Sequence, residues 1–460
     1  MNIVKIKNTI FREYDVRGIY GEELDPDVAY TFGRSFGSYV QLNGEKEVLV
    51  GNDNRESGPY LSNGIIKGLI DSGINVINLG LVTTPMYYYA RKKYNIKTGI
   101  MITASHNPRE YNGFKIAFNH GGNAYGEEIY KFRDYTNQGN FLSGTGKIKT
   151  LDIKEDYLDN ILNSVDLGNR KVKVVYDCGN GTGSIIVKDI LKMFPNIECE
   201  FLYCDSDPTF PNHHPDPCVH ANMIDLGNKV KELGYDIGIG IDGDADRVGV
   251  VDEEGNVISV DLLMAIIYRY LNNKLKNRKA LFDVKCSKAL IDELEKLNIE
   301  PVMYRTGASY TCMMVNSGDF DFGGEYSGHL FFRDKYQGFD DGIYAGLRII
   351  EILSNTDKKC SELLEGMNKY YSTEELKFEA NDNIKFEIVE KVKQYCEDKK
   401  YEMITLDGVR ATFNDSWALI RCSNTGPNIT VRFEAKTEER LNELENEFTS
   451  LLKKLLDEYK

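Results

Sequence analysis

Three stretches of this 460-residue chain repeat one order of elements, and that order constrains the fold more than any other feature. In each stretch an apolar run is followed by a helical pattern, a second apolar run and a third run that ends in a polar loop. The copies cover 48–50, 61–70, 76–79 and 99–102; then 172–176, 185–194, 200–203 and 237–241; then 281–282, 289–297, 301–304 and 319–322. Alternating strands and helices of this kind predict α/β domains, each with its polar loop at the same end of its sheet.

The C-terminal part follows a different pattern. Apolar residues over 417–421 and 429–433 predict two adjacent strands joined by a polar turn, and a leucine-rich stripe from 441 to 455 predicts a closing helix. Because 460 residues exceed a single core, we expect three similar α/β domains with mixed sheets plus a smaller C-terminal α+β domain around a central cleft. The expected boundaries are 1–150, 151–255, 256–368 and 369–460, with a linker and hinge near 367–378.

Composition excludes several classes of protein. The net charge of −15, with no Lys/Arg cluster to offset it, argues against nucleic acid as a partner. Nine cysteines are scattered without a CxxC pair, which is typical of reduced thiols in a reducing compartment. No stretch approaches eighteen apolar residues, and residues 1–5 lack a signal-peptide core. We therefore expect a cytoplasmic protein without membrane partners, as a monomer or a homodimer.

The first chemical loop is Thr103-Ala-Ser-His-Asn-Pro108, directly after the apolar run 99–102. Open α/β sheets bind ligands at the carboxyl ends of their strands, so this loop is a candidate site. Ser105, with His106 beside it and Lys115 nearby, is a candidate nucleophile or phosphoryl carrier. A simple polar turn after a buried strand is the alternative.

The second loop carries Asp242, Asp244 and Asp246 at alternating positions after an apolar run. Three carboxylates that converge repel one another unless a cation lies among them, and Mg²⁺ is the ion expected beside phosphate. A solvated acidic turn is one alternative. A twelve-residue calcium loop ending at Glu253 is another, but 248–251 has the pattern of a strand.

Two further loops contain groups that bind sugars and phosphates. Gly324-Glu-Tyr-Ser-Gly-His329 offers polar side chains between glycines, although a hairpin turn would explain it equally well. Arg421-Cys-Ser-Asn-Thr-Gly-Pro427, with Arg432 on the next strand, has the composition of a phosphate-dianion site.

Two other segments are set aside. The run 177–183 reads G-x-G-x-G instead of the dinucleotide fingerprint, and a Gly-rich turn suffices to explain it. His213 and His214 are adjacent in a proline-rich stretch, so their side chains point apart and a shared metal is not favoured.

Together these loops resemble the α-D-phosphohexomutase superfamily of phosphomannomutases and phosphoglucomutases. The resemblance covers its phosphoserine, metal, sugar and phosphate loops in order. Further matches are Phe11-Arg-Glu-Tyr-Asp-Val-Arg-Gly18, Asn52-Asp-Asn-Arg55 and Phe210-Pro-Asn-His-His-Pro-Asp-Pro217.

The resemblance implies transfer of phosphate between C1 and C6 of a hexose through a phosphoserine enzyme and a bound bisphosphate. It implies Ser105 as phosphoryl carrier, one Mg²⁺ on Ser105, Asp242, Asp244 and Asp246, and a sugar bisphosphate as activator. Arg17 and Arg247 are expected to stabilise the transferring group. Lys115 is expected to act as general base with a lowered pKa, and His329 as general acid; a phosphate contact is the alternative for Lys115. The expected substrate-binding residues are Tyr14, Lys285, Arg305, Glu325, Ser327, Arg421, Ser423, Asn424 and Thr425.

Two departures from the family pattern concern the sugar. Ala308 stands where a histidine is common, and Tyr326 where methionine is frequent. We expect a phosphomannomutase that also accepts glucose 1-phosphate. The alternatives are a phosphoglucosamine mutase, a non-catalytic phosphosugar-binding protein and a metal-dependent phosphatase. Sugar preference, oligomeric state, the phosphorylation state of Ser105 and the pathway do not follow from the sequence.

Overall fold

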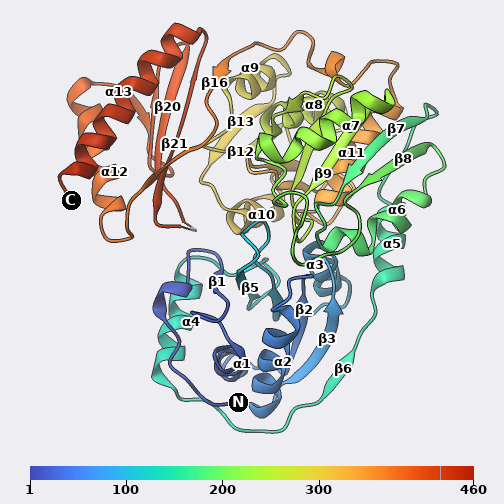
Figure 1. The fold of residues 1–460 in the computed structure, drawn as a ribbon, viewed down its shortest axis with the longest axis vertical. Coiled ribbons are helices and arrows are strands. Elements are labelled where there is room, and N and C mark those ends of the chain that lie inside the picture. Colours follow the sequence, from blue (N-terminus) through green and yellow to red (C-terminus); the bar gives the residue numbers. More distant parts are fainter. Residues whose placement is uncertain (425, 460) are drawn as a thin grey trace. The chain divides into compact units, whose positions relative to one another are not determined.

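The structure is a computed structural model that describes residues 1–424 and 426–459 (Figure 1). The chain forms two compact units. Unit 1 consists of Met1–Val260, Cys312–Phe322 and Ser327–Leu363, and unit 2 of Asp261–Thr311, Gly323–Tyr326 and Leu364–Lys460. The third repeat is thus divided between the units, and each unit is described by itself.

The first sheet of unit 1 has six strands in the order β1-β5-β4-β2-β3-β6. Strand β2 is parallel to β3 and β4, whereas β5 runs antiparallel to β4 and β1. The strands are β1 (Val16–Ile19), β2 (Glu47–Asn52), β3 (Asn75–Leu81), β4 (Gly99–Ile102), β5 (Tyr111–Ala117) and β6 (Ile148–Thr150). The helices are η1 (Asn8–Ile10), α1 (Pro26–Gln41), α2 (Gly58–Asp71), α3 (Thr84–Lys93) and α4 (Glu127–Gln138).

Helices α1 and α2 lie side by side (Figure 1) because glycines line their contact. A Cβ on Gly33 would lie 2.3 Å from the Ile65 carbonyl oxygen, so only glycine permits this approach. The phenylalanines Phe32, Phe114 and Phe132 pack in the core between these helices, α4 and the sheet. This core supports β4, whose carboxyl end carries the Ser105 loop.

The second sheet of unit 1 has the order β11-β10-β9-β7-β8, with β7 parallel to β8 and β9. Its strands are β7 (Val172–Asp177), β8 (Ile197–Leu202), β9 (Ile237–Ile241), β10 (Val248–Val251) and β11 (Val257–Ile258). Its helices are α5 (Lys154–Leu162), η2 (Thr182–Ile185), α6 (Val187–Lys192), η3 (His220–Met223), α7 (Ile224–Leu233) and α11 (Gly342–Ser354). The aspartate loop follows β9. One continuous helix was expected over 185–194, but the structure has a short 3₁₀ helix, η2, followed by a separate α-helix, α6.

The third repeat contributes to both units. In unit 2, β12 (Lys279–Asp283) is parallel to β13 (Glu300–Tyr304) and β14 (Phe322–Gly324), with helix α9 (Lys288–Lys296) between β12 and β13. The strand expected over 319–322 is therefore displaced, since β14 begins only at Phe322. The remaining elements are α8 (Val260–Leu271), α10 (Ala308–Asn316), β15 (Leu330–Phe332) and η4 (Ser361–Leu364).

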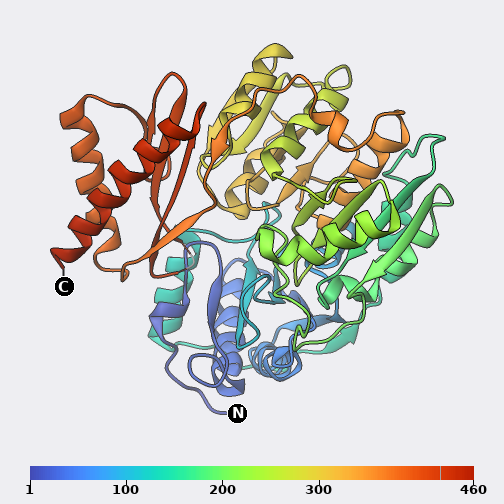
Figure 2. The ribbon, with the colours of Figure 1, turned by 45° about the horizontal axis from the view of Figure 1, so that its top comes forward.

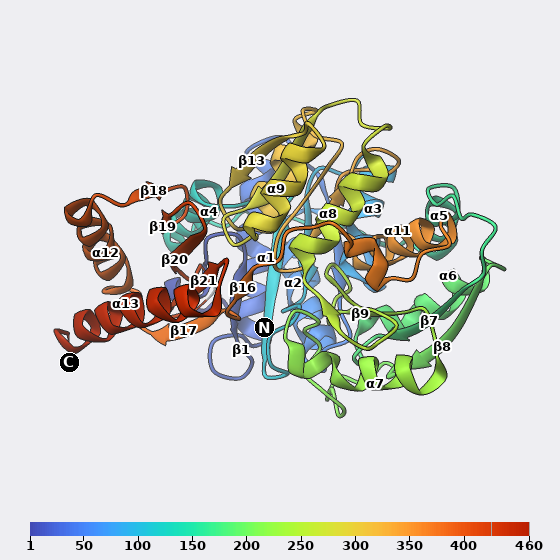
Figure 3. The same cartoon turned by 90° about the horizontal axis from the view of Figure 1, so that it is seen from above.

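The C-terminal sheet of unit 2 has the order β16-β21-β20-β19-β18, and β17 also pairs with β21. Helices α12 (Lys385–Lys399) and α13 (Glu438–Asp457) pack on β20 and β21, as Figures 2 and 3 show. The strands are β16 (Tyr371–Ser372), β17 (Leu376–Glu379), β18 (Glu402–Ile404), β19 (Val409–Thr412), β20 (Ser416–Cys422) and β21 (Asn428–Ala435). In the segment 367–378, expected to be a linker and hinge, β16 and most of β17 hydrogen-bond to β21. Its role as a domain boundary and hinge stays a prediction.

Three α/β domains and a smaller C-terminal α+β domain are thereby confirmed. The polar loop of each repeat follows a strand that is parallel to the first strand of that repeat, so the loops lie at the same end of their sheets as predicted. The central cleft stays a prediction. Among the described residues, helices that are both long and apolar enough to cross a bilayer are absent.

Candidate active site

The Ser105 side chain points at the aspartate loop of the second sheet. Its Oγ donates a 2.6 Å hydrogen bond to Asp242 Oδ2 and lies 3.2 Å from His106 Nδ1. Ser105 is buried, and its φ of +49° lies in the left-handed region that non-glycine residues rarely adopt. Strained backbone of this kind clusters at functional sites, where surrounding contacts enforce it. The contact joins the first and second predicted loops.

The three aspartates converge after β9. One oxygen from each of Asp242, Asp244 and Asp246 lies within 4.8 Å of the others, and all three residues are buried. Asp242 Oδ1 accepts hydrogen bonds from the backbone N–H groups of Asp246 (3.0 Å) and Arg247 (3.1 Å). These two bonds fix the conformation of the turn around the Asp242 carboxylate.

Glycine at position 243 lets this turn approach the serine loop. A Cβ there would lie 2.6 Å from the Ser105 carbonyl oxygen, well inside a normal contact. A side chain at 243 would therefore push apart the nucleophile and the aspartates.

The aspartate cluster fits a divalent cation. Burial and then the charges of Asp244 and Asp246 raise the pKa of Asp242 well above its ordinary value, so the cluster resists holding three negative charges. Asp244 Oδ1 and Asp246 Oδ1 are buried without a hydrogen-bond partner within the described part of the chain. Carboxylate oxygens are the ligands that Mg²⁺ prefers, and a cation would satisfy these two atoms.

Lys115 on β5 lies against the same carboxylates. Its Nζ is 2.8 Å from Asp244 Oδ2 and also contacts Asp246 Oδ2. Burial opposes the charge on Lys115, but the two aspartates outweigh it and raise its pKa well above the ordinary value. This direction is opposite to the expected lowered pKa and suits the alternative of a charged phosphate contact, while the general-base role of Lys115 stays a prediction.

His329 approaches the cluster from the other side. Its Nδ1 lies 2.7 Å from Asp340 Oδ2 and 3.6 Å from Asp246 Oδ1, and its backbone pairs with Arg247 in an isolated β-bridge. Sequence reasoning missed Asp340, which lies just before α11 and has no motif of its own. A carboxylate on Nδ1 fixes the ring and directs Nε2 elsewhere.

Two arginines lie beside the serine and aspartate loops of unit 1. Arg17 donates to Asn107 Oδ1 (2.6 Å) in the serine loop and pairs with Asp15 (2.5 Å). Arg247 Nε lies 3.8 Å from Asp242 Oδ2. Unit 1 thus brings together Ser105, Lys115, His329, Arg17, Arg247 and the three aspartates. Tyr14 and Ser327 belong to the same unit and are half-buried.

Unit 2 assembles the predicted sugar and phosphate groups around other partners. Glu325 Oε1 accepts hydrogen bonds from the Gly307 N–H (3.0 Å) and Thr311 Oγ1 (2.6 Å). Asp407 Oδ2 receives the Thr306 N–H (3.1 Å) and Arg421 Nε (2.9 Å). Asp407 therefore links the segment before Ala308 to Arg421 of the phosphate turn. Sequence reasoning missed Asp407, because it lies in no recognisable motif.

The other predicted groups of unit 2 are also placed. Lys285 Nζ pairs with Glu375 Oε1 at 2.8 Å, and Arg305 lies over the Tyr310 ring at 4.2 Å. Ser423 Oγ accepts the Gly426 N–H at 3.1 Å, and Asn424 is half-buried. Thr425 lies outside the described residues. Tyr326, unexplained in the sequence, has the guanidinium of Arg432 3.8 Å from its ring centre.

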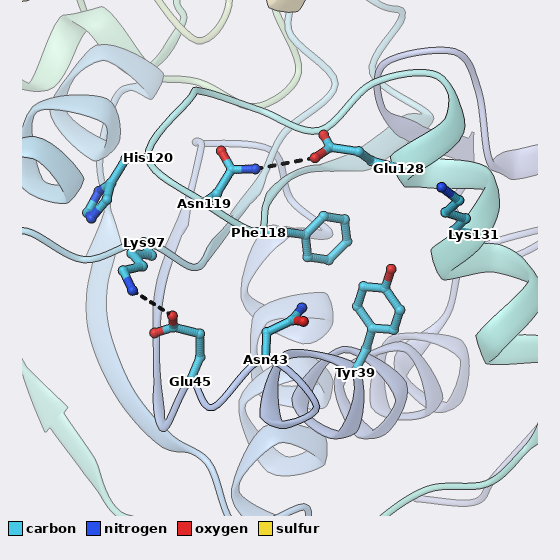
Figure 4. A pocket seen from close by; sticks show the side chains of 9 residues that line it. All are labelled: Tyr39, Asn43, Glu45, Lys97, Phe118, Asn119, His120, Glu128 and Lys131. Atoms are coloured by element: carbon cyan, nitrogen blue, oxygen red, sulfur yellow. Dashed lines mark hydrogen bonds and ion pairs between the residues drawn. The ribbon is translucent and has the colours of Figure 1, made fainter.

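A surface pocket of about 450 Å³ lies elsewhere in unit 1 (Figure 4). Lys97 Nζ pairs with Glu45 there at 3.0 Å, and Asn119 Nδ2 donates to Glu128 at 3.2 Å. The other residues that line it are Tyr39, Asn43, Phe118, His120 and Lys131. It contains none of the predicted site residues.

Comparison with known proteins agrees with this geometry. Sequence models of phosphoglucomutase/phosphomannomutase match for the alpha/beta/alpha domains I (8–142), II (155–255) and III (259–370) and the C-terminal domain (375–451). A phosphomannomutase/phosphoglucomutase of Pseudomonas syringae pv. tomato is 39% identical, covering 98% of this chain and 96% of the relative. A phosphoglucomutase/phosphomannomutase of Thermococcus kodakarensis is 33% identical, covering 98% of each.

A solved structure shares the fold over the same length. The crystal structure of a phosphoglucomutase/phosphomannomutase family protein from Burkholderia thailandensis has a TM-score of 0.89 and 34% identity, covering 98% of both chains. The chain therefore belongs to the phosphoglucomutase/phosphomannomutase family across all four of its domains.

Proposed function

We propose that this protein is a phosphohexomutase that interconverts a hexose 1-phosphate and a hexose 6-phosphate, with mannose or glucose as the sugar. The observation that carries the proposal is the 2.6 Å contact of Ser105 Oγ with Asp242, beside two more buried carboxylates. A serine hydroxyl on a cation-binding cluster is suited to carry a phosphoryl group. The names of the relatives support the same reaction.

The reaction has two balanced transfers. In the first, the bond between phosphorus and Ser105 Oγ breaks as a sugar hydroxyl forms a new bond to phosphorus and loses its proton. The sugar bisphosphate then turns over. In the second transfer, Ser105 Oγ forms a bond to its other phosphorus, the bond between that phosphorus and the sugar oxygen breaks, and this sugar oxygen takes up the proton released in the first transfer. A sugar bisphosphate is proposed as the activator because it supplies the first phosphoserine.

His329 is proposed to move the proton in both transfers. Its Nδ1 is held by Asp340, so Nε2 is the ring atom that exchanges the proton with the sugar hydroxyl. Lys115, Arg17 and Arg247 are proposed to hold the negative oxygens of the transferring group. Lys115 is assigned this contact instead of the base role because its ammonium is paired with two aspartates.

Asp242, Asp244 and Asp246, together with Ser105, would hold one Mg²⁺, which when bound neutralises negative charge on the phosphoserine. In unit 2, Glu325 is proposed for the sugar hydroxyls and Arg421, Ser423, Asn424 and Thr425 for the phosphate that does not react. Lys285, Arg305, Tyr14 and Ser327 are proposed as secondary contacts. The nine free cysteines support a cytoplasmic location, and monomer or homodimer stays a prediction.

The test is a coupled assay with mannose 1-phosphate, glucose 1-phosphate and glucosamine 1-phosphate, each with Mg²⁺ and trace bisphosphate. We expect 6-phosphate product from mannose and glucose, and loss of several orders of magnitude in Ser105→Ala with Mg²⁺ binding retained. Ser164→Ala is the matched control, because the side-chain hydroxyl of this buried serine of unit 1 donates to the helix carbonyl of Asn160 in its own segment, and the substitution leaves the Ser164 backbone unchanged.

Three results would contradict the proposal. Turnover of glucosamine 1-phosphate alone identifies a phosphoglucosamine mutase. Release of inorganic phosphate without isomerisation identifies a phosphatase. Binding of hexose phosphates without any product identifies a non-catalytic phosphosugar-binding protein.

A further inference from the structure

We propose that Arg55 is a positioning residue that holds the backbone of the serine loop in the conformation required for phosphoryl transfer. The inference rests on the proposed function, because it assigns a role in that same site. Arg55 lies in the segment Asn52-Asp-Asn-Arg55, to which no role has been assigned above.

The Arg55 guanidinium is bonded to three carbonyl oxygens of the serine loop and to that of Tyr111 at the start of β5. Nη2 donates to Ser105 O (2.7 Å) and Asn107 O (2.6 Å). Nη1 donates to Pro108 O (2.7 Å) and Tyr111 O (2.9 Å). The residue is 1% exposed, so these bonds are shielded from water. One side chain thus spans the loop from the nucleophile to the start of β5.

The guanidinium is itself held in place. Asp53 Oδ1 accepts the Arg55 backbone N–H at 3.0 Å, and Asp53 Oδ2 lies 3.4 Å from Arg55 Nε. The Phe210 ring lies 5.5 Å from the guanidinium carbon. Asp53 continues directly from the buried strand β2, so Arg55 is anchored to the sheet and not to the loop that it holds.

The residue before Arg55 connects the same turn to the second sheet. Asn54 donates through its backbone N–H to Thr182 Oγ1 (3.0 Å) and through Nδ2 to Asn180 O (2.9 Å). Thr182 in turn donates its N–H to Gly243 O (2.8 Å) in the aspartate turn. The segment therefore links the serine loop and the aspartate turn through one short chain of hydrogen bonds.

The backbone of Ser105 needs such support. Its φ of +49° is unfavourable for serine, and its carbonyl is the atom against which Gly243 packs. Arg55 holds this same carbonyl. Without the guanidinium, the loop is free to relax toward an ordinary conformation and to carry Oγ away from Asp242.

Lysine cannot replace arginine here. A guanidinium presents five N–H donors in a rigid plane, whereas an ammonium presents three donors at one point. The four acceptors are contacted through two separate nitrogens, a pattern that an ammonium cannot reproduce. Arg55 contacts backbone and no reacting atom, so it acts through Ser105.

The experiment compares Arg55→Lys and Arg55→Ala with Arg91→Lys. Arg91 is a matched control, since it is also buried in unit 1 and donates to three backbone carbonyls, those of Lys97, Asn119 and Gly122, outside the serine loop. We expect both Arg55 variants to lose about 10²-fold in kcat, as misplacement of reacting groups by about 1 Å does, with KM little changed. Arg91→Lys should keep its kcat.

Two readouts separate positioning from general stability. Low millimolar guanidinium should restore part of the kcat of Arg55→Ala, while methylammonium at equal concentration should not. Hydrogen–deuterium exchange of residues 103–111 should increase in Arg55→Lys and remain unchanged in Arg91→Lys. This second readout requires no turnover and stands even if Arg55→Ala does not fold.

Equal loss of kcat in Arg55→Lys and Arg91→Lys, with unchanged exchange of the serine loop, would overturn the inference. Increased loop exchange in Arg55→Lys, together with a wild-type protein that isomerises no hexose phosphate, would support the Arg55 contact while overturning the proposed function. The two proposals therefore fail separately.

Discussion

Gly243→Ala is the most incisive single change to the proposed site, because it adds one methyl group between the serine loop and the aspartate turn. The new Cβ would lie 2.6 Å from Ser105 O, whereas real Cβ atoms essentially never approach closer than 3.0 Å. The loops must therefore separate by at least the difference between these distances. The atom that the new Cβ meets is backbone, and Arg55 also hydrogen-bonds the Ser105 carbonyl, so no side chain can rotate to relieve the contact.

The magnitude follows from that separation. Misplacement of reacting groups by about 1 Å costs on the order of 10²-fold in rate, so about half that shift should cost about tenfold, equivalent to about 1.4 kcal/mol in the barrier. We expect kcat in the coupled assay to fall at least to this extent, with KM for hexose 1-phosphate little changed. An unchanged kcat in Gly243→Ala would contradict the close contact between the aspartate turn and the serine loop.

Gly240→Ala is the matched control for this change. Gly240 lies on β9 three residues before Gly243, and a Cβ there would meet Met223 Sδ at 3.1 Å. A methionine side chain is flexible and can move aside, so we expect little change in kcat. Equal losses in both variants would show that any added methyl group in this region impairs the enzyme.

Three further predictions concern the charges of unit 1. Removal of divalent ions should abolish turnover and lower the unfolding temperature. Mg²⁺ at about 100 Kd should restore about 2.7 kcal/mol of stability in wild type but not in Asp244→Asn. An equal Mg²⁺ effect in that variant would contradict Asp244 as a metal ligand. Asp340→Asn should lower kcat by about 10²-fold with little change in KM, because the Asp340 carboxylate, 2.7 Å from His329 Nδ1, pairs with the imidazole that moves the proton. Unchanged kcat in steady-state assays would contradict that role. Burial raises the pKa of Asp341 from 3.8 to about 6, so the folded protein binds this proton more tightly than the unfolded chain. Its stabilising contribution is complete below about pH 4 and lost as pH rises through about 6, a change of about 3 kcal/mol. Urea unfolding from about pH 4 to about pH 7 should show this dependence in wild type and its loss in Asp341→Asn; parallel curves would contradict it.

Much of the fold was predictable because its elements have strong local patterns. The apolar runs before Ser105 and Asp242 coincide with β4 and β9, since buried strands are nearly continuous apolar sequences. The strands β16 and β17 within 367–378 could not be predicted, because they pair with the distant strand β21 and are too short to show an alternating pattern. The break between η2 and α6 could not be predicted either, because Ile186, where it occurs, is not a helix-breaking residue.

The site was predictable where chemistry clusters in one loop. Ser105 and the three aspartates each stand in a short motif after an apolar strand. Their convergence was implied only by the family resemblance, because β4 and β9 belong to different sheets. Asp340, Asp407 and Arg55 act on residues far away in sequence, with Arg55 separated from Ser105 by 50 positions. No local spacing encodes such pairs, because they form only when loops from different strands meet.

The central claim is that Ser105 carries the phosphoryl group. Its most direct test is mass spectrometry of the protein after incubation with Mg²⁺ and a hexose 1,6-bisphosphate, followed by proteolysis and fragmentation of the peptide that contains residues 103–108. We expect one phosphoryl group on Ser105 in wild type, absent in Ser105→Ala and removed by excess hexose monophosphate. A phosphoryl group on another residue, or a Ser105 that stays unmodified while the enzyme turns over, would contradict it.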